Sequence, residues 1–198
     1  MQTLKGNRPR QSSSAAVPPR FGGPTFSRRN RMARALWTMS WTLLAAWTPS
    51  PFMPWRRGLL RVFGARLAPT AIVRSSARIW WPGNLEMGDH ASLGPGAICY
   101  NVAPVTIGAG AIVSQRAHLC TAGHDIDDAG FPLVSRPIVV GKNAWVAAEA
   151  FVGPGVRLGD GAVLGARAVT VRDLAADTVY VGNPARPVRL RSHGHSTP

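Results

Sequence analysis

A repeat of six residues runs through the chain from about residue 67 to residue 169. Each unit starts with an aliphatic residue, often continues with glycine, and has a small residue four places after the first. The clearest run is contiguous and reads VGKNAW, VAAEAF, VGPGVR, LGDGAV and LGARAV, residues 140–169. A period of six matches neither the 3.6 of an α-helix nor the alternation of a half-buried strand. The repeat therefore predicts short strands joined by tight turns, one strand to each unit.

Three such units would close one triangular coil of 18 residues. The aliphatic residue would point inward and stack on its equivalent in the next coil, and the small residue would also face the narrow interior. Glycine would support the turn. Backbone hydrogen bonds would run between coils. We therefore expect an all-β solenoid, a parallel β-helix, over residues 67–175, with a C-terminal tail over residues 176–198.

A second spacing locates the insertions into this solenoid. Gly88, Gly108, Gly141 and Gly159 occupy the same place in LEMG, VTIG, IVVG and VRLG, and they are 20, 33 and 18 residues apart. Two extra residues therefore fall near 100–104, and an excursion of about 15 residues falls within 121–137. In a solenoid such insertions can only project outward.

The charge is divided unevenly along the chain. Residues 1–66 contain 12 of the 23 Lys and Arg and none of the nine Asp and Glu, whereas residues 67–198 are close to neutral. A nucleic-acid-binding domain would carry its basic patch on the folded body, so we expect no nucleic-acid partner.

Cys99 and Cys120 occupy places where a small apolar residue fits the repeat. We interpret them as free thiols rather than as one disulfide.

The N-terminal third is expected to have two parts. Residues 1–30, rich in Ser, Pro, Gly and Arg, are predicted to be a disordered basic tail. Residues 31–66 are predicted to be helical, with an uncharged helix over 35–48 that ends before Pro49 and Pro51. That helix is too short to span a bilayer, which takes about 20 residues. The arginine-rich, acid-free start also resembles an organelle transit peptide.

Tryptophans and arginines in the helical segment leave two interpretations open. Trp37, Trp41 and Leu44 share a helical face, with Trp47 close by, and arginines flank the helix on both sides. Residues 28–61 could therefore contact an anionic membrane surface peripherally. The same face could instead pack on its own domain or on a neighbouring subunit.

The repeat and three further motifs resemble the hexapeptide-repeat O-acetyltransferases. The matching stretches are PVTIGAGAIVSQRAHLCTAGHDIDD, the run from FPLVSRPIVVG to LGARAV, and VYVGNPARPVR, and the likeness covers about residues 21–191. It is strongest to the colanic acid biosynthesis type and to the galactoside and maltose type. The resemblance implies a left-handed β-helix, a homotrimer with its sites between subunits, acetyl-CoA as donor and a saccharide hydroxyl as acceptor.

The resemblance also implies a general base. The base is the histidine of the GHD motif, His124, which suits proton removal from an alcohol because its ordinary pKa lies near neutrality. Asp125, more than Asp127 or Asp128, could orient His124 or bind sugar hydroxyls, and Asn101 at the two-residue insertion is a further candidate for the sugar. Trp145 matches a tryptophan of the family's active-site channel.

Donor-binding residues follow from the same resemblance. Ala148 and Ala166 match positions along which the acyl-CoA arm runs, where small residues allow close approach. Arg186 and Arg189 match basic residues near the phosphates of CoA, and Arg172 could add to them. The chemistry needs no metal, and none is expected.

Other interpretations of the fold stay open beside this one. A serine acetyltransferase or a sugar-nucleotide N-acyltransferase could use the same β-helix, and so could a non-catalytic protein or a carbonic-anhydrase-like enzyme with metal-binding histidines. We expect an O-acetyltransferase of exopolysaccharide biosynthesis in the cytoplasm, at the inner face of the membrane if the helical segment binds there.

Overall fold

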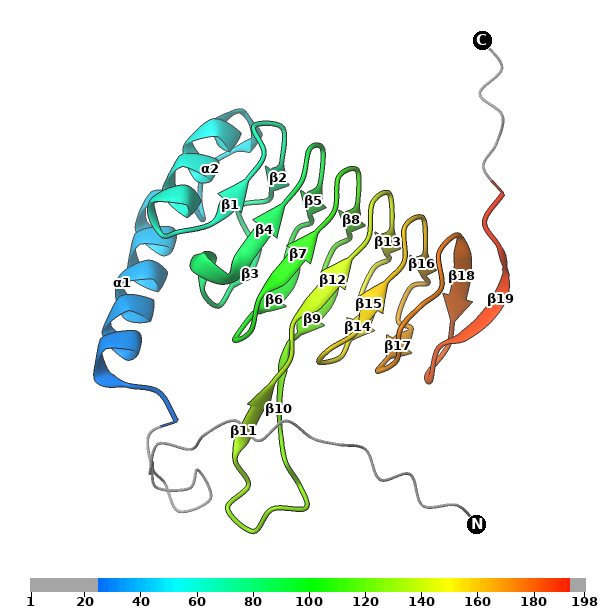
Figure 1. Ribbon diagram of the computed structural model, residues 1–198. Helices are drawn as coiled ribbons and strands as arrows, with labels where there is room; N and C mark the ends of the chain where they lie inside the picture. The colour runs from blue at the N-terminus through cyan, green and yellow to red at the C-terminus, as the bar shows by residue number, and fades with distance from the viewer. Residues whose placement is uncertain (1–24, 193–198) are drawn as a thin grey trace.

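The computed structural model describes residues 25–192, and most of the predicted disordered tail lies outside them. Helix α1 (Arg28–Leu44), the short 3-10 helix η2 (Ser50–Phe52) and helix α2 (Met53–Val62) come first in the chain. They lie at the N-terminal end of a solenoid whose coils follow one another across Figure 1. The expected fold, a β-solenoid with an N-terminal helical segment, is confirmed.

Three faces form the solenoid, and their strands run parallel except for β19. Face A consists of β1 (Arg66–Leu67), β4 (Leu85–Met87), β7 (Val105–Ile107), β12 (Ile138–Val140) and β15 (Arg157–Leu158). Face B consists of β2 (Ile72–Val73), β5 (Ser92–Leu93), β8 (Ile112–Val113), β13 (Trp145–Val146), β16 (Val163–Leu164), β18 (Thr178–Val181) and β19 (Arg186–Leu190). Face C consists of β3 (Arg78–Ile79), β6 (Ile98–Tyr100), β9 (His118–Cys120), β14 (Phe151–Val152) and β17 (Val169–Thr170).

The register between coils follows the aliphatic positions of the repeat. On face A, Leu67 pairs with Met87, Met87 with Ile107, Ile107 with Val140, and Val140 with Leu158. The insertions near 100–104 and within 121–137 fall where the glycine spacing places them. One further insertion was not predicted: the first coil also has two extra residues, beside the 3-10 helix η3 (Pro82–Asn84).

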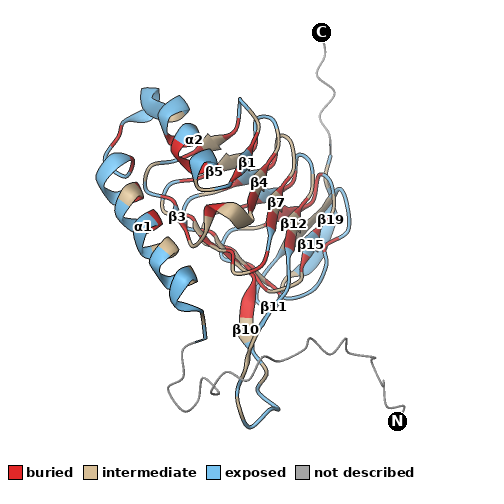
Figure 2. Cartoon of the chain, turned by 60° about the vertical axis from the view of Figure 1, so that its left-hand side comes forward, coloured by how far each residue is buried: buried red, intermediate tan, exposed pale blue. Residues whose placement is uncertain are grey.

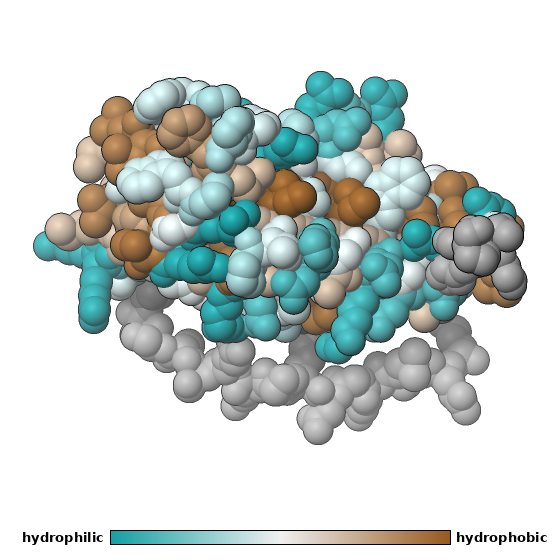
Figure 3. Space-filling view, turned by 90° about the horizontal axis from the view of Figure 1, so that it is seen from above, coloured by the Kyte–Doolittle hydropathy of each residue, from teal (hydrophilic) through white to brown (hydrophobic). Residues whose placement is uncertain are grey.

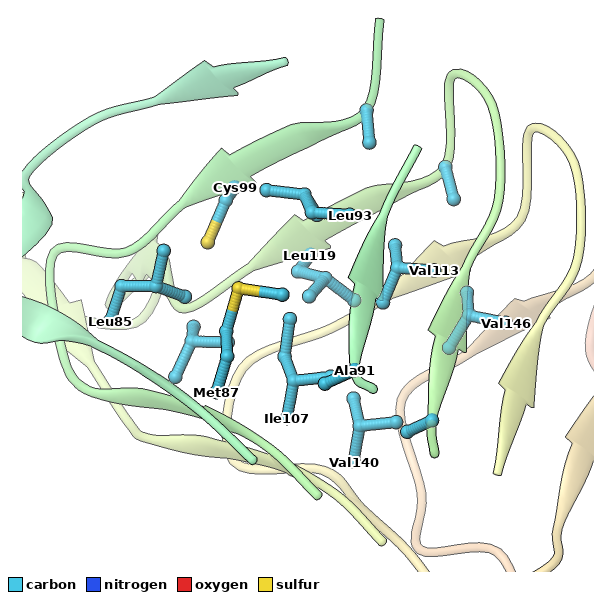
Figure 4. Packing of buried hydrophobic residues seen from close by; sticks show 14 of the residues in the cluster. Leu85, Met87, Ala91, Leu93, Cys99, Ile107, Val113, Leu119, Val140 and Val146 are labelled. Atoms are coloured by element: carbon cyan, nitrogen blue, oxygen red, sulfur yellow. The ribbon is translucent and has the colours of Figure 1, made fainter. Parts of the chain in front are cut away.

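The interior is filled by the two repeat positions that were predicted to face it. The aliphatic residues of successive coils stack on one another, as Met87, Ile107 and Val140 do in Figure 4. The alanines four places after each face A aliphatic residue are fully buried: Ala71, Ala91, Ala111, Ala144 and Ala162. Figure 2 shows this buried interior running through the coils. Because the space is narrow, a larger residue at these alanines would cost about 1–3 kcal/mol of stability.

The glycine in the second place of a repeat unit has a different role from the one expected. A Cβ added to Gly108 would lie 2.7 Å from the backbone nitrogen of Lys142 in the next coil, and one added to Gly141 would lie 2.7 Å from that of Asp160. These glycines therefore allow coils to approach one another. The left-handed turn conformation is taken two residues later, for example by Asn143 at a φ of 54°.

The N-terminal helices pack on the first coils of the solenoid. Trp37 and Trp41 are buried, and the Trp37 indole donates to the carbonyl of Ile79 at 2.8 Å. Trp37 and Trp41 thus pack on their own domain, which was one of the two interpretations. Leu44 and Trp47, which were expected on or near the same face, are exposed. Helix α1 also begins earlier than predicted, because the side chain of Ser27 caps it by accepting from the backbone of Asn30.

Arg56, one of the arginines that follow the predicted helix and could have met a membrane surface, is buried. Its guanidinium donates to the carbonyls of Val73, Thr48 and Pro49 and to the Thr48 hydroxyl. Burial lowers the pKa of this guanidinium, with a smaller contribution from the charge of Arg74. Arg56 therefore ties α2 to the solenoid rather than facing a partner.

Two other features complete the fold. Residues 176–198 were predicted to be a tail, yet β18 and β19 extend face B, with β18 parallel to β16 and β19 antiparallel to β18. Both cysteines are free thiols, as interpreted from the repeat. Cys99 is fully buried, and burial raises its pKa to about 12, whereas Cys120 is partly exposed.

Candidate active site

The 15-residue excursion is a β-hairpin. Its strands β10 (Ala122–His124) and β11 (Leu133–Ser135) pair antiparallel, with His124 opposite Leu133. The hairpin leaves the solenoid after β9 on face C and returns at β12 on face A, so it projects from the corner between these faces, at the bottom of Figure 1. His124 therefore sits at the outer end of a hydrogen-bonded strand rather than in an unstructured loop.

His124 is held by Phe131 on the other side of the hairpin turn. Its Nδ1 lies 2.9 Å from the Phe131 carbonyl oxygen, and the two rings are stacked with centroids 4.4 Å apart. A carbonyl oxygen can only accept, so Nδ1 must carry the hydrogen in this contact. In the neutral imidazole the lone pair is then on Nε2. The side chain is exposed, so Nε2 is available to an incoming group.

The aspartates of the hairpin shape its turn. The Asp125 carboxylate accepts from the backbone nitrogen of Asp127 at 3.2 Å, and the Asp128 carboxylate accepts from that of Gly130 at 2.7 Å. The backbone nitrogen of Asp125 donates to Pro132 across the turn. The carbonyl of Phe131 thus contacts His124 Nδ1, and sequence reasoning had no signal for a backbone partner.

A groove runs over face B and the corner between faces B and C. It has a volume of about 500 Å³ and is lined by Ser114, Gln115, Trp145, Ala147, Ala148, Val163, Gly165, Ala166, Val179, Arg189, Arg191 and Ser192. Four of the predicted site residues therefore share this face B groove: Trp145, Ala148, Ala166 and Arg189. Trp145 and Ala148 come from one coil, Ala166 comes from the next coil, and Arg189 comes from the antiparallel strand β19.

Two residues that the sequence did not single out complete the face B groove. The Trp145 indole donates to the Ser114 hydroxyl at 2.8 Å, a contact between adjacent coils that fixes the ring. Arg191 donates to the carbonyls of Asn143 and Gly161 and so ties the segment after β19 to two corner turns. β13 pairs with β8, so Trp145 lies beside Ile112 and close to Ser114 in the preceding coil. The register of the solenoid could therefore have predicted the contact with Ser114, but it could not have predicted that of Arg191.

Three predicted residues lie away from both the hairpin and the groove lining. Arg186 begins β19, and Arg172 follows β17; both are exposed but neither lines the groove. Asn101 is fully buried, and its amide both donates to and accepts from the backbone of Trp81. The structure thus gives Asn101 a bracing role between the first and second coils, with no exposed atom to offer a sugar.

The hairpin and the face B groove occupy different corners of one chain. The groove follows the turns after β8, β13 and β16, which lead from face B to face C. The hairpin follows β9, at the next corner of the triangle. The described residues contain no group of three or more His, Cys, Asp or Glu placed to hold a metal ion.

Comparisons of the sequence with known proteins identify relatives of this chain. No family model matches the sequence. A protein of Escherichia coli K12 named "Putative colanic acid biosynthesis acetyltransferase WcaF" is 38% identical over 179 residues, which cover 90% of this chain and 96% of the relative. At this identity and coverage the match extends through the helices as well as the solenoid.

Solved structures share the solenoid. A maltose O-acetyltransferase from Clostridium difficile 630 has a TM-score of 0.74 at 24% identity, covering 84% of this chain and 90% of its own. A hexapeptide-repeat acetyltransferase from Vibrio cholerae, complexed with acetyl coenzyme A, has a TM-score of 0.69 at 21% identity, covering 85% and 92%. These likenesses show the fold, a left-handed parallel β-helix, and confirm the expected handedness.

Proposed function

The chain belongs to the hexapeptide-repeat acetyltransferases and is an acyltransferase; on that premise, we propose that it moves the acetyl group of acetyl-CoA to a hydroxyl of a saccharide. The name of the Escherichia coli relative supports an acceptor in exopolysaccharide biosynthesis. The acetyl coenzyme A bound in the Vibrio cholerae structure supports acetyl-CoA as the donor. The observation that carries the proposal in this chain is the orientation of His124.

His124 acts as the general base in this proposal. Its Nδ1–H is held by the Phe131 carbonyl, so Nε2 is the atom that takes the proton of the acceptor hydroxyl. The hydroxyl oxygen attacks the thioester carbonyl, a carbon–oxygen bond forms and the carbon–sulfur bond breaks. The imidazolium returns the proton to the departing thiolate. The products are the acetyl ester and the free thiol, and the enzyme needs no covalent intermediate.

The Phe131 carbonyl supports this role in a second way. When Nε2 gains a proton, the imidazolium carries a positive charge, and a carbonyl oxygen at Nδ1 stabilises that charge through a stronger hydrogen bond. The stacked Phe131 ring fixes the plane of the imidazole. Together these contacts restrict the direction from which the acceptor can approach Nε2.

The face B groove receives the donor in this proposal. Ala148, Gly165 and Ala166 keep its floor open, so an extended pantetheine arm could lie against the backbone of successive coils. Arg189 and Arg191 place guanidinium groups along it, which suits phosphate groups. Arg172 and Arg186, outside the lining, would contact only the part of CoA that extends beyond the groove. Trp145 would border the acetyl end.

The separation of the two features leads to a homotrimer. His124 and the face B groove project from different corners of one chain, so we propose that the hairpin of one subunit lies over the groove of its neighbour. A cyclic trimer repeats this contact three times and leaves no end unpaired.

We further propose a cytoplasmic enzyme with a peripheral membrane contact through residues 28–61. The structure's described helices include none with the length and apolarity to cross a bilayer.

One experiment tests the transfer. The purified protein is incubated with acetyl-CoA and a panel of lipid-linked and free oligosaccharides, and the products are analysed by mass spectrometry before and after mild alkali. We expect an acetylated saccharide whose acetyl group is lost in alkali, as an ester is. Transfer only to amino sugars, with an alkali-stable product, would instead indicate an N-acyltransferase.

A second experiment tests the site between subunits. Chains carrying His124→Ala and chains carrying Ala166→Trp, which fills the groove, are co-expressed. Each variant alone is expected to have little activity at an acetyl-CoA concentration below the raised KM of Ala166→Trp. A mixed trimer can combine an intact His124 from one chain with an intact groove from the other, so co-expression is expected to restore part of the activity. No restoration in mixed trimers verified by mass would contradict the shared site.

A further inference from the structure

Helix α1 has a second apolar face that no described part of the chain covers. Met32, Leu36, Met39 and Leu43 recur at intervals of three and four residues, so they share one side of the helix. Trp47 follows Leu43 at the same spacing, three residues after the helix ends. We call all of these residues the apolar stripe. Each is between 52% and 73% exposed, whereas Trp37 and Trp41 on the other side pack on the solenoid. A helix that is apolar on both sides is normally covered on both.

The apolar surface continues past the end of the stripe. Phe52, the last residue of η2, and Trp55, in the first turn of α2, are 52% and 49% exposed. The indoles of Trp47 and Trp55 donate to the carbonyls of Leu43 and Leu44, both at 2.7 Å. Their polar N–H groups are therefore satisfied within the chain. Figure 3 shows hydrophobic side chains gathered at this helical end of the molecule.

The charges beside the apolar stripe are all positive. Arg28, Arg29 and Arg31 are exposed in the first turn of α1, and within the described part of the chain no carboxylate pairs with them. The other arginines of the segment are engaged; Arg34, for example, lies over the rings of Phe26 and Trp80. Positive charge at a helix N-terminus opposes the helix dipole. The charges of these three arginines are thus little stabilised within the molecule, and an external anion would stabilise them.

A second copy of the chain fits this surface poorly. Residues 1–85 contain no Asp or Glu, so contact between two copies of this segment would bring like charges together. The first acidic residue, Glu86, is already paired with Arg66 at 2.8 Å. An anionic lipid surface supplies what the segment lacks, which is an apolar layer bordered by negative headgroups.

We propose that the apolar stripe of α1, with Arg28, Arg29 and Arg31, docks the enzyme on an anionic membrane surface. This rests on the proposed function and specifies its membrane contact, which moves to the face of the helix opposite Trp37 and Trp41. Helix α1 would lie parallel to the membrane plane, with the apolar stripe inserted at the headgroup boundary and Trp37 and Trp41 facing the solenoid.

Vesicle sedimentation with the full-length protein tests the proposal. The vesicles are phosphatidylcholine with or without phosphatidylglycerol, and no acetyl-CoA is present. We expect binding to the anionic vesicles that weakens with added salt, because surface charge is screened. The double variant Leu36→Glu/Leu43→Glu is expected to bind about tenfold more weakly or worse. The matched control is Ala35→Glu/Thr42→Glu, which adds the same charges at the same spacing on an exposed flank of the stripe.

The outcomes separate this proposal from the others. The control is expected to retain most of the binding, and both double variants are expected to acetylate a soluble acceptor as the unmodified enzyme does. No binding of the unmodified protein to anionic vesicles, or equal loss in both double variants, would overturn the docking surface without touching the acetyl transfer. A smaller mass for Leu36→Glu/Leu43→Glu in light scattering without vesicles would instead assign the stripe to a subunit contact.

Discussion

The imidazole of His124 is held by Phe131: its Nδ1 meets the Phe131 carbonyl at 2.9 Å, and the Phe131 ring stacks on it with a centroid distance of 4.4 Å. Both contacts come from one residue, which has a left-handed backbone with a φ of 49°. The hairpin turn thus aims a carbonyl and a ring at the same histidine. This relationship assigns the hydrogen to Nδ1 and the basic lone pair to Nε2.

Replacing Phe131 tests this arrangement. Phe131→Ala keeps the backbone carbonyl but removes the stacked ring, so the imidazole gains freedom to leave its plane. We expect kcat to fall about tenfold with little change in KM for acetyl-CoA. Ile126→Ala, at an exposed site in the same turn, is the control and is expected to leave kcat unchanged. Equal effects of the two variants would show that the ring has no positioning role.

Asn101 offers a test between a structural and a substrate-binding role. Its amide is buried and bonded twice to the backbone of Trp81. Asn101→Ala would leave those backbone groups without partners, at a cost of about 2 kcal/mol in the free energy of unfolding. Chemical denaturation at matched protein concentration measures this cost. A raised KM for the saccharide at unchanged stability would return Asn101 to the substrate site.

The groove is tested by filling it. Ala166→Trp places a large ring in the face B groove, and we expect KM for acetyl-CoA to rise at least tenfold. Lys142→Trp places the same ring two residues after the aliphatic residue of a unit, as Ala166→Trp does, but at the corner between faces A and B. That control is expected to leave KM unchanged. An unchanged KM in both variants would mean that the donor binds elsewhere.

The side chain of His118 is expected to make the stability of the fold depend on pH. Burial lowers its pKa in the folded chain, and its Nε2 is buried without a hydrogen-bond partner among the described residues. The unfolded chain takes up this proton near the ordinary value of 6.5, before the folded chain does, so acidification below that pH favours unfolding. The melting temperature is expected to fall less on acidification in His118→Phe than in the unmodified protein. Parallel curves for the two proteins would contradict this origin.

The architecture could be predicted from the sequence because one short period determines it. Each hexapeptide unit contributes its own strand and turn, so the register follows from counting, and the insertions appear as errors in the count. The insertion in the first coil was not predicted, because Pro82 and Gly83 lie where the repeat is weak. Strands β18 and β19 were not predicted, because β18 follows a coil that is shortened by two residues and the antiparallel β19 departs from the repeat.

The site was less accessible to sequence reasoning than the fold. Trp145, Ala148 and Ala166 could be placed together because adjacent coils stack, whereas Arg189 reaches the same groove from the antiparallel β19, which the repeat does not predict. The partner of His124 could not be assigned, since it is a backbone carbonyl that no residue type reveals. Asn101 illustrates the opposite failure: an insertion residue can be buried to brace its coil instead of being presented to a ligand.

The most direct test of the account is kcat for acetyl transfer to a saccharide by His124→Ala, measured under saturating acetyl-CoA at matched trimer concentration. Loss of a general base is expected to lower kcat about 100-fold to 10,000-fold while the protein keeps its melting temperature and its affinity for acetyl-CoA. A His124→Ala enzyme that acetylates the saccharide at the unmodified rate would contradict the assignment of His124 as the base.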